Sequence, residues 1–396
     1  MNVLVINAGS SSLKYQLINM VDQQVLCKGQ VERIGIEGSF LKQKGGAEEA
    51  DIHAEIKNHN DAIQMVLEAL TDAKHGVVKS LEEIDAVGHR VLHGGEKFAD
   101  PVLVDEQVIH DLEAIADLGP LHMPANISGI KACQQAMPVP QVAVFDTGFH
   151  QTMPPKAYLY GLPYEAYEKH KVRRYGFHGT SHLFVSQRAA ELRGTEKGRM
   201  ITCHLGNGSS LCAILDGKCM DTSMGLTPLE GVVMGTRSGD MDPAIVKFIM
   251  EKEHKTIEEM DHYLNKESGV YGLSGVSSDF RDLAKAAAEG HRRAILALDV
   301  FIYRIQKYIG AYAAALGGVD TLVFTAGIGE NDAKMRKDIL TGMEWLGIQL
   351  DDEANQQRGE HKISAPDSKV EVWVIPTNEE LVIARETVRL AKQAKA

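Results

Sequence analysis

The chain has 396 residues, of which 44% are hydrophobic and 24% charged, a composition that excludes disordered, collagen-like and coiled-coil proteins. At roughly 150 residues per domain, this length predicts two or three domains. Asp and Glu number 54 against 42 Lys and Arg, which gives a formal charge of −12. Such an acidic chain is not expected to bind nucleic acid or an anionic membrane non-specifically, so any phosphate must be bound by locally placed groups.

No targeting or membrane segment is expected. The N-terminus reads MNVLVIN and lacks the basic and long apolar regions of a signal peptide. No apolar run reaches the length of about 18 residues that a membrane-spanning helix needs. The five cysteines, at positions 27, 133, 203, 212 and 219, form no CxxC pair. We therefore expect a reduced, cytoplasmic protein with neither a zinc site nor a disulfide framework.

Two segments about half a chain apart share one pattern. Residues 3–17 read VLVINAGSSSLKYQL and residues 200–214 read MITCHLGNGSSLCAI. In each, a β-branched run, a Gly/Ser turn and an alternating run predict a β-hairpin. We interpret them as the first hairpins of two similar domains, although a chance likeness of two Gly/Ser hairpins explains the pattern equally well.

The rest of the chain indicates an α/β architecture. Apolar runs at residues 84–92, 141–145, 321–325 and 370–375 predict strands, and residues 61–70 predict an amphipathic helix. Strands that alternate with helices favour a mixed, largely parallel sheet. In such sheets the ligand lies beyond the carboxyl ends of the strands, where most polar motifs of this chain fall.

One long helix with a broad apolar face is expected over residues 294–316. Its apolar residues recur at alternating spacings of three and four: Ile295, Leu298, Ile302, Ile305, Ile309, Tyr312 and Leu316. Phe301, Tyr308 and Ala315 widen this face. A central buried helix and a subunit interface both fit the pattern, and we interpret the helix first as core.

Three Gly-rich turns follow predicted strands, at residues 7–12, 204–210 and 327–331. Glycine lets the backbone approach an anion closely and direct its N–H groups toward it. Any one of these turns alone is better explained as an ordinary hairpin or βα turn, but three together indicate a phosphate site. The P-loop, the GxGxxG fingerprint and the protein-kinase motifs are absent from the sequence.

Two arginines and two histidines stand out by their neighbours. Arg90 ends a predicted strand within GHRVLHGG, and Arg237 lies in GTRSGDMDP before a helix. An arginine flanked by Gly or Ser in a loop is suited to bidentate binding of a carboxylate or phosphate, although most arginines here are expected on the surface. His178 lies in RRYGFHGTSH and His122 in a turn before a helix, whereas most of the 16 histidines are expected to be structural or solvated.

Three carboxylates follow predicted strands. Asp146 follows one strand, and Glu379 and Glu380 follow another. A carboxylate in this position beside a phosphate site is suited to bind Mg²⁺, usually through water. The two glutamates would equally serve to stabilise the first turn of a helix. Asp279 is interpreted first as a helix N-cap, and a ribose contact stays open.

Taken in order, the motifs resemble those of the acetokinase family, in the acetate and sugar kinase, Hsp70 and actin superfamily. They are VLVINAGSSSLKY, GHRVLHGGEKF, FDTGFH, RRYGFHGTSH, HLGNGSS, TRSGDMDP, SDFRD, FTAGIGEN and IPTNEEL, and the likeness extends over residues 3–385. The resemblance implies an α/β fold of two duplicated RNase H-like (actin-like ATPase) domains with an active-site cleft between them. Residues 1–148 plus 381–396 would form one domain, and residues 149–380 the nucleotide-binding domain.

The resemblance also implies roles for individual residues. Asn7 and Glu379 resemble the family's Mg²⁺ contacts, with Mn²⁺ as an alternative ion. Its catalytic residues correspond to Arg90, His122, Asp146, His178 and Arg237. Its acyl-substrate contacts correspond to Arg90, Leu92, Leu121, Phe177 and Pro228. Its ATP and ADP contacts correspond to Lys14, His204, Leu205, Gly206, Asn207, Gly208, Asp279, Phe280, Arg281, Gly327, Ile328, Gly329, Glu330 and Asn331.

By resemblance, the expected reaction is reversible, Mg²⁺-dependent phosphoryl transfer from ATP to acetate by direct in-line transfer. The resemblance also implies a homodimer, for which the broad face of helix 294–316 is a candidate interface. Propionate and butyrate kinases share the motifs and stay alternatives. A carboxylic acid is already ionised at neutral pH, so no strong general base is needed. Catalysis should come from positioning and charge neutralisation, with Asp146 orienting an arginine or a metal-bound water and proton transfer as its alternative role.

Two other classes of protein are alternatives. A nucleotide-gated ATPase clamp would use the Gly-rich turns, but it has no reason to concentrate Arg90, His178 and Arg237 beside a γ-phosphate. A serine hydrolase would use a serine of residues 10–12, but the sequence has no GxSxG elbow. The carboxylate kinase is therefore the favoured hypothesis.

Overall fold

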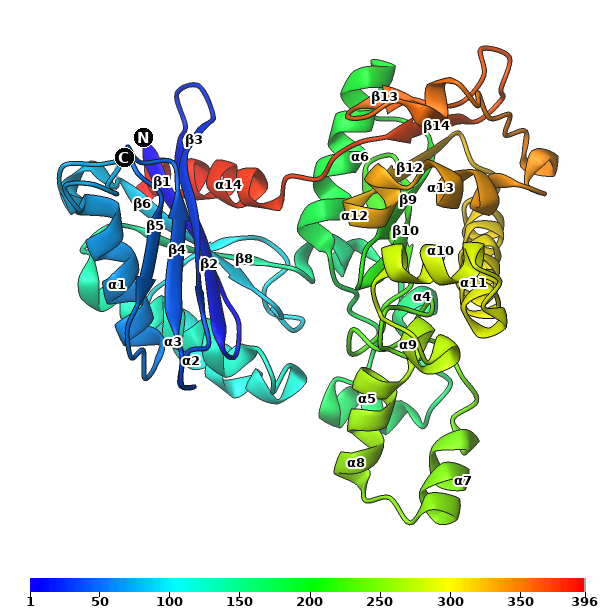
Figure 1. Ribbon diagram of the computed structural model, residues 1–396, viewed down its shortest axis with the longest axis horizontal. Coiled ribbons are helices and arrows are strands. Elements are labelled where there is room, and N and C mark those ends of the chain that lie inside the picture. Colours follow the sequence, from blue (N-terminus) through cyan, green and yellow to red (C-terminus); the bar gives the residue numbers. More distant parts are fainter. Residues whose placement is uncertain (395–396) are drawn as a thin grey trace. The chain divides into compact units, whose positions relative to one another are not determined.

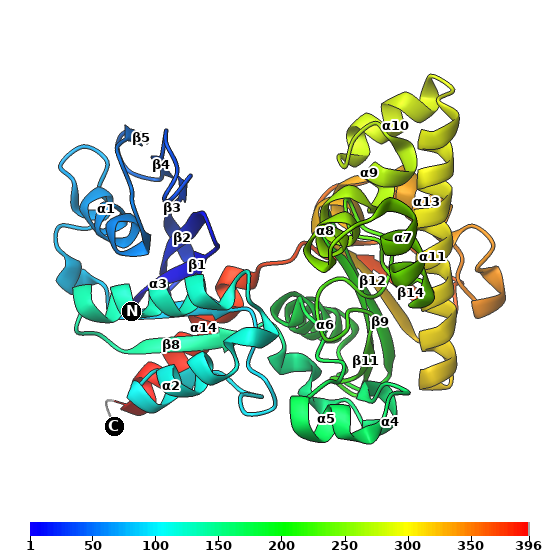
Figure 2. The same ribbon diagram turned by 90° about the horizontal axis from the view of Figure 1, so that it is seen from below.

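The computed structural model describes residues 1–394, which divide into two compact units. Unit 1 consists of Met1–Gly148 with the C-terminal segment that begins at Asn378, and unit 2 consists of Phe149–Thr377. Each unit is a β-sheet with helices on its faces (Figures 1 and 2). The last helix of the chain therefore belongs to the unit that the first strand begins.

Unit 1 contains an eight-stranded mixed sheet in the order β5-β4-β3-β2-β1-β6-β8-β7. β1, β6 and β8 are parallel neighbours, and the other pairs are antiparallel. The carboxyl ends of β1, β6 and β8 therefore meet at one edge of the sheet. The strands are β1 (Asn2–Ala8), β2 (Ser12–Asn19), β3 (Gln24–Glu32), β4 (Phe40–Lys44), β5 (Ala50–His53), β6 (Ala86–Val91), β7 (Val102–Leu103) and β8 (Gln141–Phe145).

The two faces of this sheet are covered by different helices. Leu4 and Ile6 of β1 pack on the side of α1 and α3, whereas Val3 and Val5 pack with Ile383 of α14 on the other side. This alternation follows from the period of two in a β-strand. The helical segments of unit 1 are α1 (His59–Thr71), η1 (Leu81–Glu83), α2 (Glu106–Ala114), η2 (Ala116–Leu118), α3 (Met123–Ala136) and α14 (Glu379–Ala394).

Unit 2 repeats the same strand plan. Its sheet has the order β11-β10-β9-β12-β14-β13, so an antiparallel hairpin meander is followed by two parallel strands, as in β3-β2-β1-β6-β8. This correspondence confirms the predicted α/β class with two duplicated domains. The strands are β9 (Arg199–Leu205), β10 (Ser209–Leu215), β11 (Lys218–Thr222), β12 (Thr321–Thr325), β13 (His361–Lys362) and β14 (Glu371–Val374).

The long helix α11 covers one face of the second sheet, and α6 covers the other. Both lie beside the sheet in Figure 2. The helical segments are η3 (Gly148–Thr152), α4 (Pro155–Tyr158), α5 (Tyr164–His170), α6 (Gly179–Arg193), α7 (Ala244–Glu253), α8 (Ile257–His262), η4 (Tyr263–Glu267), α9 (Gly269–Ser274), α10 (Phe280–Ala288), α11 (Arg292–Leu316), α12 (Ala326–Asn331), α13 (Ala333–Leu340), η5 (Glu344–Leu346) and η6 (Ala354–Gln356).

The buried face of α11 is rotated relative to the expected one. Ile305, Ile309 and Tyr312 are buried as expected, but Ile295 is 41% exposed. The smaller Ala294 and Ala297 occupy the core positions of the first turns. The apolar face is broad enough for either edge to pack, and the sheet selects the edge with small residues. Part of the apolar surface of α11 therefore stays uncovered in the single chain.

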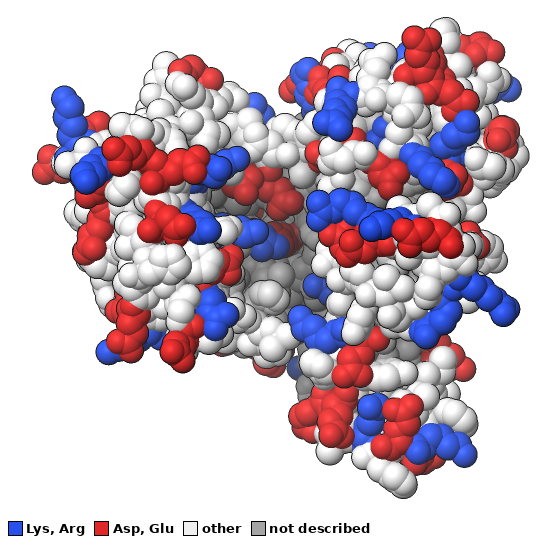
Figure 3. Space-filling view, viewed as in Figure 1, with Lys and Arg blue, Asp and Glu red and all other residues white. Residues whose placement is uncertain are grey.

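Charges of both signs are interspersed over the face of the molecule drawn in Figure 3. No helix within residues 1–394 combines the length and the apolar character needed to cross a bilayer. Although acidic residues outnumber basic ones in the sequence, they form no single continuous acidic surface on the face drawn in Figure 3.

Candidate active site

In unit 1, three polar side chains meet at the carboxyl ends of the parallel strands. Arg90 on β6 donates from Nε to Asp146 Oδ1 at 3.0 Å and from Nη2 to Asp146 Oδ2 at 2.5 Å. Its Nη1 donates to Asn7 Oδ1 at 3.1 Å. Asp146 is 1% exposed, whereas the side chain of Arg90 is 26% exposed. The carboxylate is thus a buried anchor that orients a partly accessible guanidinium.

Burial would lower the pKa of Arg90, but the negative charges of Asp146 and Glu379 outweigh this effect and raise it above its ordinary value. Glu379 lies in the first turn of α14, where the helix N-terminus also favours a carboxylate. Burial raises the pKa of Glu379 to about 7, against the lowering effect of Arg90, and the neighbouring Asp146 and Glu380 raise it further. This group of carboxylates has more negative charge than one guanidinium neutralises.

The remaining candidates of unit 1 lie at different places. Lys14 pairs with Asn7 across the hairpin, and both line a cavity of about 320 Å³ together with Glu380. Leu92 is 7% exposed after β6, whereas Leu121 is 64% exposed before α3. His122 is the N-cap residue of α3. The expected acyl contacts of unit 1 therefore differ in burial.

In unit 2, His178 is held by a buried chain of hydrogen bonds. Its Nδ1 lies 2.8 Å from Ser210 Oγ on β10, and the same hydroxyl lies 2.8 Å from His182 Nε2 on α6. His182 Nδ1 lies 2.7 Å from Thr202 Oγ1. Burial, with smaller contributions from nearby histidines, lowers the pKa of His182 well below its ordinary value, so this ring is neutral. The ring of His204 stacks on His178 at 4.0 Å.

The loop that follows β9 lies against the side chains of both His178 and Arg237. A Cβ atom placed on Gly208 would lie 3.6 Å from both His178 Nε2 and Arg237 Nη1, so both side chains lie against this glycine. Arg237 Nη1 donates to the carbonyl of Pro228 at 3.2 Å, and within residues 1–394 its guanidinium has no carboxylate partner. Burial lowers the pKa of Arg237, which indicates a cation that an anion would stabilise.

A cavity of about 720 Å³ lies at this edge of unit 2, within the usual size range of small-molecule sites. It brings together most of the expected nucleotide contacts. The side chain of Asp279 accepts from Arg281 N and caps α10, which confirms the N-cap prediction. The lining residues are Gly206, Asn207, Ser278, Asp279, Phe280, Arg281, Ala284, Gly327, Ile328, Asn331 and Asp332.

Other expected nucleotide contacts do not line this cavity: Lys14, His204, Leu205, Gly208, Gly329 and Glu330. Glu330 Oε1 instead accepts from Ala326 N at 2.8 Å and from Thr377 N at 3.1 Å. Ala326 has φ +63°, so Glu330 holds a left-handed residue at the start of α12. The carboxylate of Glu330 therefore helps to fix the backbone of the Gly-rich turn after β12.

Sequence reasoning missed Ser210, His182 and Arg336. Arg336 is 1% exposed, and its guanidinium donates to the carbonyls of Gly329 and Glu330 at 2.9 Å. It thus supports the Gly-rich turn after β12. The spacing of four between His178 and His182 is a sequence signal for one helix face, but no local signal identifies Arg336.

The structure also brings together residues that the sequence pattern had set apart. His150, Cys212 and Cys219 have ligand atoms that all lie within 4.8 Å of one another. All five cysteines are buried and unpaired. The absence of a CxxC pair therefore does not exclude a metal site, because the chain gathers these ligands from separate elements. Phe177, whose carbonyl lies 2.9 Å from His150 Nε2, is 2% exposed beside this group.

Known proteins match nearly the whole chain. The model of the acetokinase family matches residues 2–385. An acetate kinase from Treponema denticola is 62% identical over 397 residues, which cover 99% of this chain and 100% of that protein. One from Thermoanaerobacter pseudethanolicus is 60% identical over 401 residues and covers 100% of both chains.

Solved structures are similar over the same extent. The crystal structure of Porphyromonas gingivalis acetate kinase has a TM-score of 0.95 at 50% identity and covers 98% of this chain and 99% of that chain. A propionate kinase from Francisella tularensis has a TM-score of 0.92 at 43% identity, with the same coverage. The likeness thus includes enzymes named for two different carboxylic acids.

The pKa of Glu379 predicts a pH-dependent stability. Because the folded chain raises this pKa from 4.5 to about 7, its contribution to stability is fully present below pH 4.5 and is lost as the pH rises through 7. The total loss is about 3 kcal/mol. In the metal-free protein, Glu379→Gln should remove this loss. Urea denaturation at pH values from about 5 to about 8 measures how the free energy of unfolding changes with pH. The same pH dependence in the variant and the wild type would contradict the assignment.

The hydroxyl of Ser210 predicts a second measurable effect. Ser210→Ala leaves His182 Nε2 buried without its partner and should cost about 1–3 kcal/mol of stability. It should also release His178 Nδ1, so that ¹⁵N NMR of this ring reports a mixture of tautomers. Ser186→Ala is the control, because Ser186 Oγ donates only to the carbonyl of Leu183 in its own helix. An unchanged His178 spectrum would show that Ser210 does not position this ring.

Proposed function

This chain belongs to the acetokinase family, and from that premise we propose that it is a kinase that transfers the terminal phosphoryl group of ATP to acetate, reversibly and by direct in-line transfer. The products are acetyl phosphate and ADP. One observation carries the proposal: the cavity of unit 2 adjoins the loop at Gly208, against which Arg237 and His178 converge. A guanidinium and an imidazole beside a nucleotide-sized cavity are suited to bind a phosphoryl group in transfer.

We propose that the nucleotide occupies this cavity. Backbone N–H groups of the turns at residues 206–208 and 327–329 would face the phosphates, and Asp279 and Arg281 at the rim would contact the nucleoside. The guanidinium of Arg336 supports the role of the second turn because it fixes the carbonyls on the far side.

The donor set of unit 1 fits Mg²⁺. Carboxylate and amide oxygens are the ligands that this hard cation prefers, and the raised pKa of Glu379 marks a carboxyl group that lacks compensating charge. Asn7 and Glu379 would hold the ion, with Mn²⁺ as an alternative. When bound, the ion supplies charge neutralisation for the terminal phosphates.

We propose that Arg90 binds the carboxylate of the substrate. Asp146 fixes the guanidinium of Arg90 through two hydrogen bonds. The exposed part of this guanidinium is therefore already oriented to bind an anion. Within unit 1, Leu92 and Leu121 would contact the acyl chain, with His122 near the same group. Because a similar structure is a propionate kinase, propionate is the second candidate substrate. One methylene would change the preference by about 1–3 kcal/mol.

The transfer itself needs no general base. A carboxylate oxygen attacks the terminal phosphorus while the bond from that phosphorus to the oxygen of ADP breaks, and no proton moves. Arg237 and His178 would bind the equatorial oxygens, where negative charge is spread in the transition state. Ser210 would keep His178 oriented for this contact. Asp146 would act through Arg90 and would not exchange a proton with the substrate.

The organisation of the protein is also part of the proposal. Unit 1 would supply the groups that bind the carboxylate, and unit 2 those that bind the nucleotide. We propose a homodimer that covers the exposed apolar side chains of α11, of which Leu296 is 51% and Tyr303 59% exposed. The five unpaired cysteines support a reducing, cytoplasmic location.

Trapping with hydroxylamine tests the function. The purified protein is incubated with ATP and Mg²⁺, and acetate, propionate or butyrate is added in turn. An acyl hydroxamate that forms only with a carboxylate is the expected result, and the order of rates identifies the preferred acid. Release of ADP without hydroxamate, independent of added acid, would instead indicate an ATPase clamp and would overturn the kinase.

Arg237→Ala tests the transition-state role. The variant should lose a factor of about 10²–10³ in kcat, as expected for one electrostatic donor, while KM for ATP changes little. Arg188→Ala is the matched control and should keep full activity, because Arg188 pairs with Glu360 on the surface. A kcat within a few-fold of wild type for Arg237→Ala would contradict the proposed role.

A further inference from the structure

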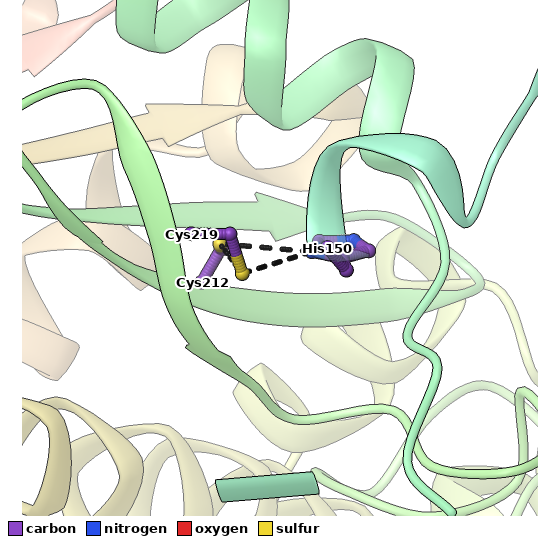
Figure 4. A group of neighbouring side chains, drawn as sticks. All are labelled: His150, Cys212 and Cys219. Atoms are coloured by element: carbon purple, nitrogen blue, oxygen red, sulfur yellow. Dashed lines mark hydrogen bonds between the residues drawn. The ribbon is translucent and has the colours of Figure 1, made fainter. Parts of the chain in front are cut away.

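A second group of chemically active side chains lies inside unit 2, apart from the residues proposed for catalysis. His150 comes from η3, Cys212 from β10 and Cys219 from β11, and none of the three has any exposed surface. Figure 4 shows the two cysteine side chains facing the ring of His150. Ile214, two residues after Cys212, pairs with Cys219, so both cysteines project from the same face of the sheet.

The distances between the three ligand atoms suit one shared ion. Cys219 Sγ lies 3.2 Å from His150 Nδ1 and 3.4 Å from Cys212 Sγ, and Cys212 Sγ lies 3.9 Å from His150 Nδ1. A tetrahedral ion with sulfur ligands at about 2.3 Å and nitrogen ligands at about 2.0 Å requires S···S separations of about 3.8 Å and S···N separations of about 3.5 Å. Each observed separation differs from these by less than about half an ångström, which small side-chain rotations supply.

The ring of His150 is oriented as in a metal ligand. Its Nε2 lies 2.9 Å from the carbonyl oxygen of Phe177, and this oxygen only accepts, so Nε2 carries the proton. In a neutral ring the lone pair is then on Nδ1, the atom that faces both sulfurs. Histidines that bind metals commonly donate their other N–H to a backbone carbonyl in this way.

Charge selects the kind of ion. Two thiolates neutralise a divalent cation, so the occupied site has no net charge to bury in the apolar cluster that contains Met153 and Ile214. Sulfur and imidazole ligands select zinc over magnesium, which requires oxygen ligands. We propose that His150, Cys212 and Cys219 form a binding site for Zn²⁺, with one coordination position left for a small ligand.

The ion would add direct bonds between η3, β10 and β11, which hydrogen bonds already connect. It would link the β10–β11 hairpin to η3 and would fix the ring of His150. That ring in turn contacts the carbonyl oxygen of Phe177. The next residue, His178, has a left-handed backbone with φ 58°. A conformation of this kind persists only where neighbouring contacts fix it. The site would therefore stabilise the segment that presents His178, independently of the proposed reaction.

Metal analysis of the full chain tests the proposal. Protein is produced with added zinc sulfate, so that the ion enters during folding, and is purified under reducing conditions over a metal-chelating resin. We expect about one zinc ion per chain in wild type and less than about a tenth of that in Cys219→Ser. Cys27→Ser, which changes a buried cysteine of unit 1, is the matched control and should keep its zinc.

Cobalt provides a readout that needs no variant. Protein produced with Co²⁺ should show a thiolate-to-cobalt charge-transfer band, and its Tm should exceed that of metal-free protein. Wild-type protein without zinc and without this band would overturn the proposal. Equal zinc in wild type and Cys219→Ser would also overturn it, as would a Cys212–Cys219 disulfide in place of the ion.

Discussion

Compensation of buried charge at the ends of the parallel strands positions the polar side chains of unit 1. Asp146 has lost nearly all contact with water, and its charge is tolerated because Arg90 donates to both of its oxygens. The guanidinium is therefore held at the edge where β1, β6 and β8 end. Asn7 and Glu379 reach the same edge because β1 and α14 pack on the same strands.

The two units share a strand order but gather different polar side chains at the ends of their parallel strands. The strand order of unit 1 recurs in unit 2, so both sheets present their polar groups beyond the same parallel strands. Unit 1 gathers carboxylates around one arginine, whereas unit 2 gathers His178, His204 and Arg237 around a Gly-rich loop. The first environment suits a cation and a clamped anion, and the second suits phosphates. One ancestral plan thus provides two complementary electrostatic environments.

The sequence was informative wherever a local signal has one physical solution. The runs at residues 141–145 and 321–325 are strands with those bounds, because a short apolar run before Gly-rich residues fits few other structures. The face of α11 was misassigned around Ile295, since its broad apolar surface packs at either edge. Ser210, His182 and Arg336 were missed because their partners come from elements distant in the sequence, and only the sheet brings them together.

The strand β10 contributes residues both to the candidate active site and to the group formed by His150, Cys212 and Cys219. Ser210 and Cys212 are two residues apart, so both face α6: the first contacts His178 and His182, and the second contacts Cys219 and His150. His150 in turn contacts Phe177, which precedes His178. The backbone and the ring of His178 are thus held from two sides by one face of a single strand.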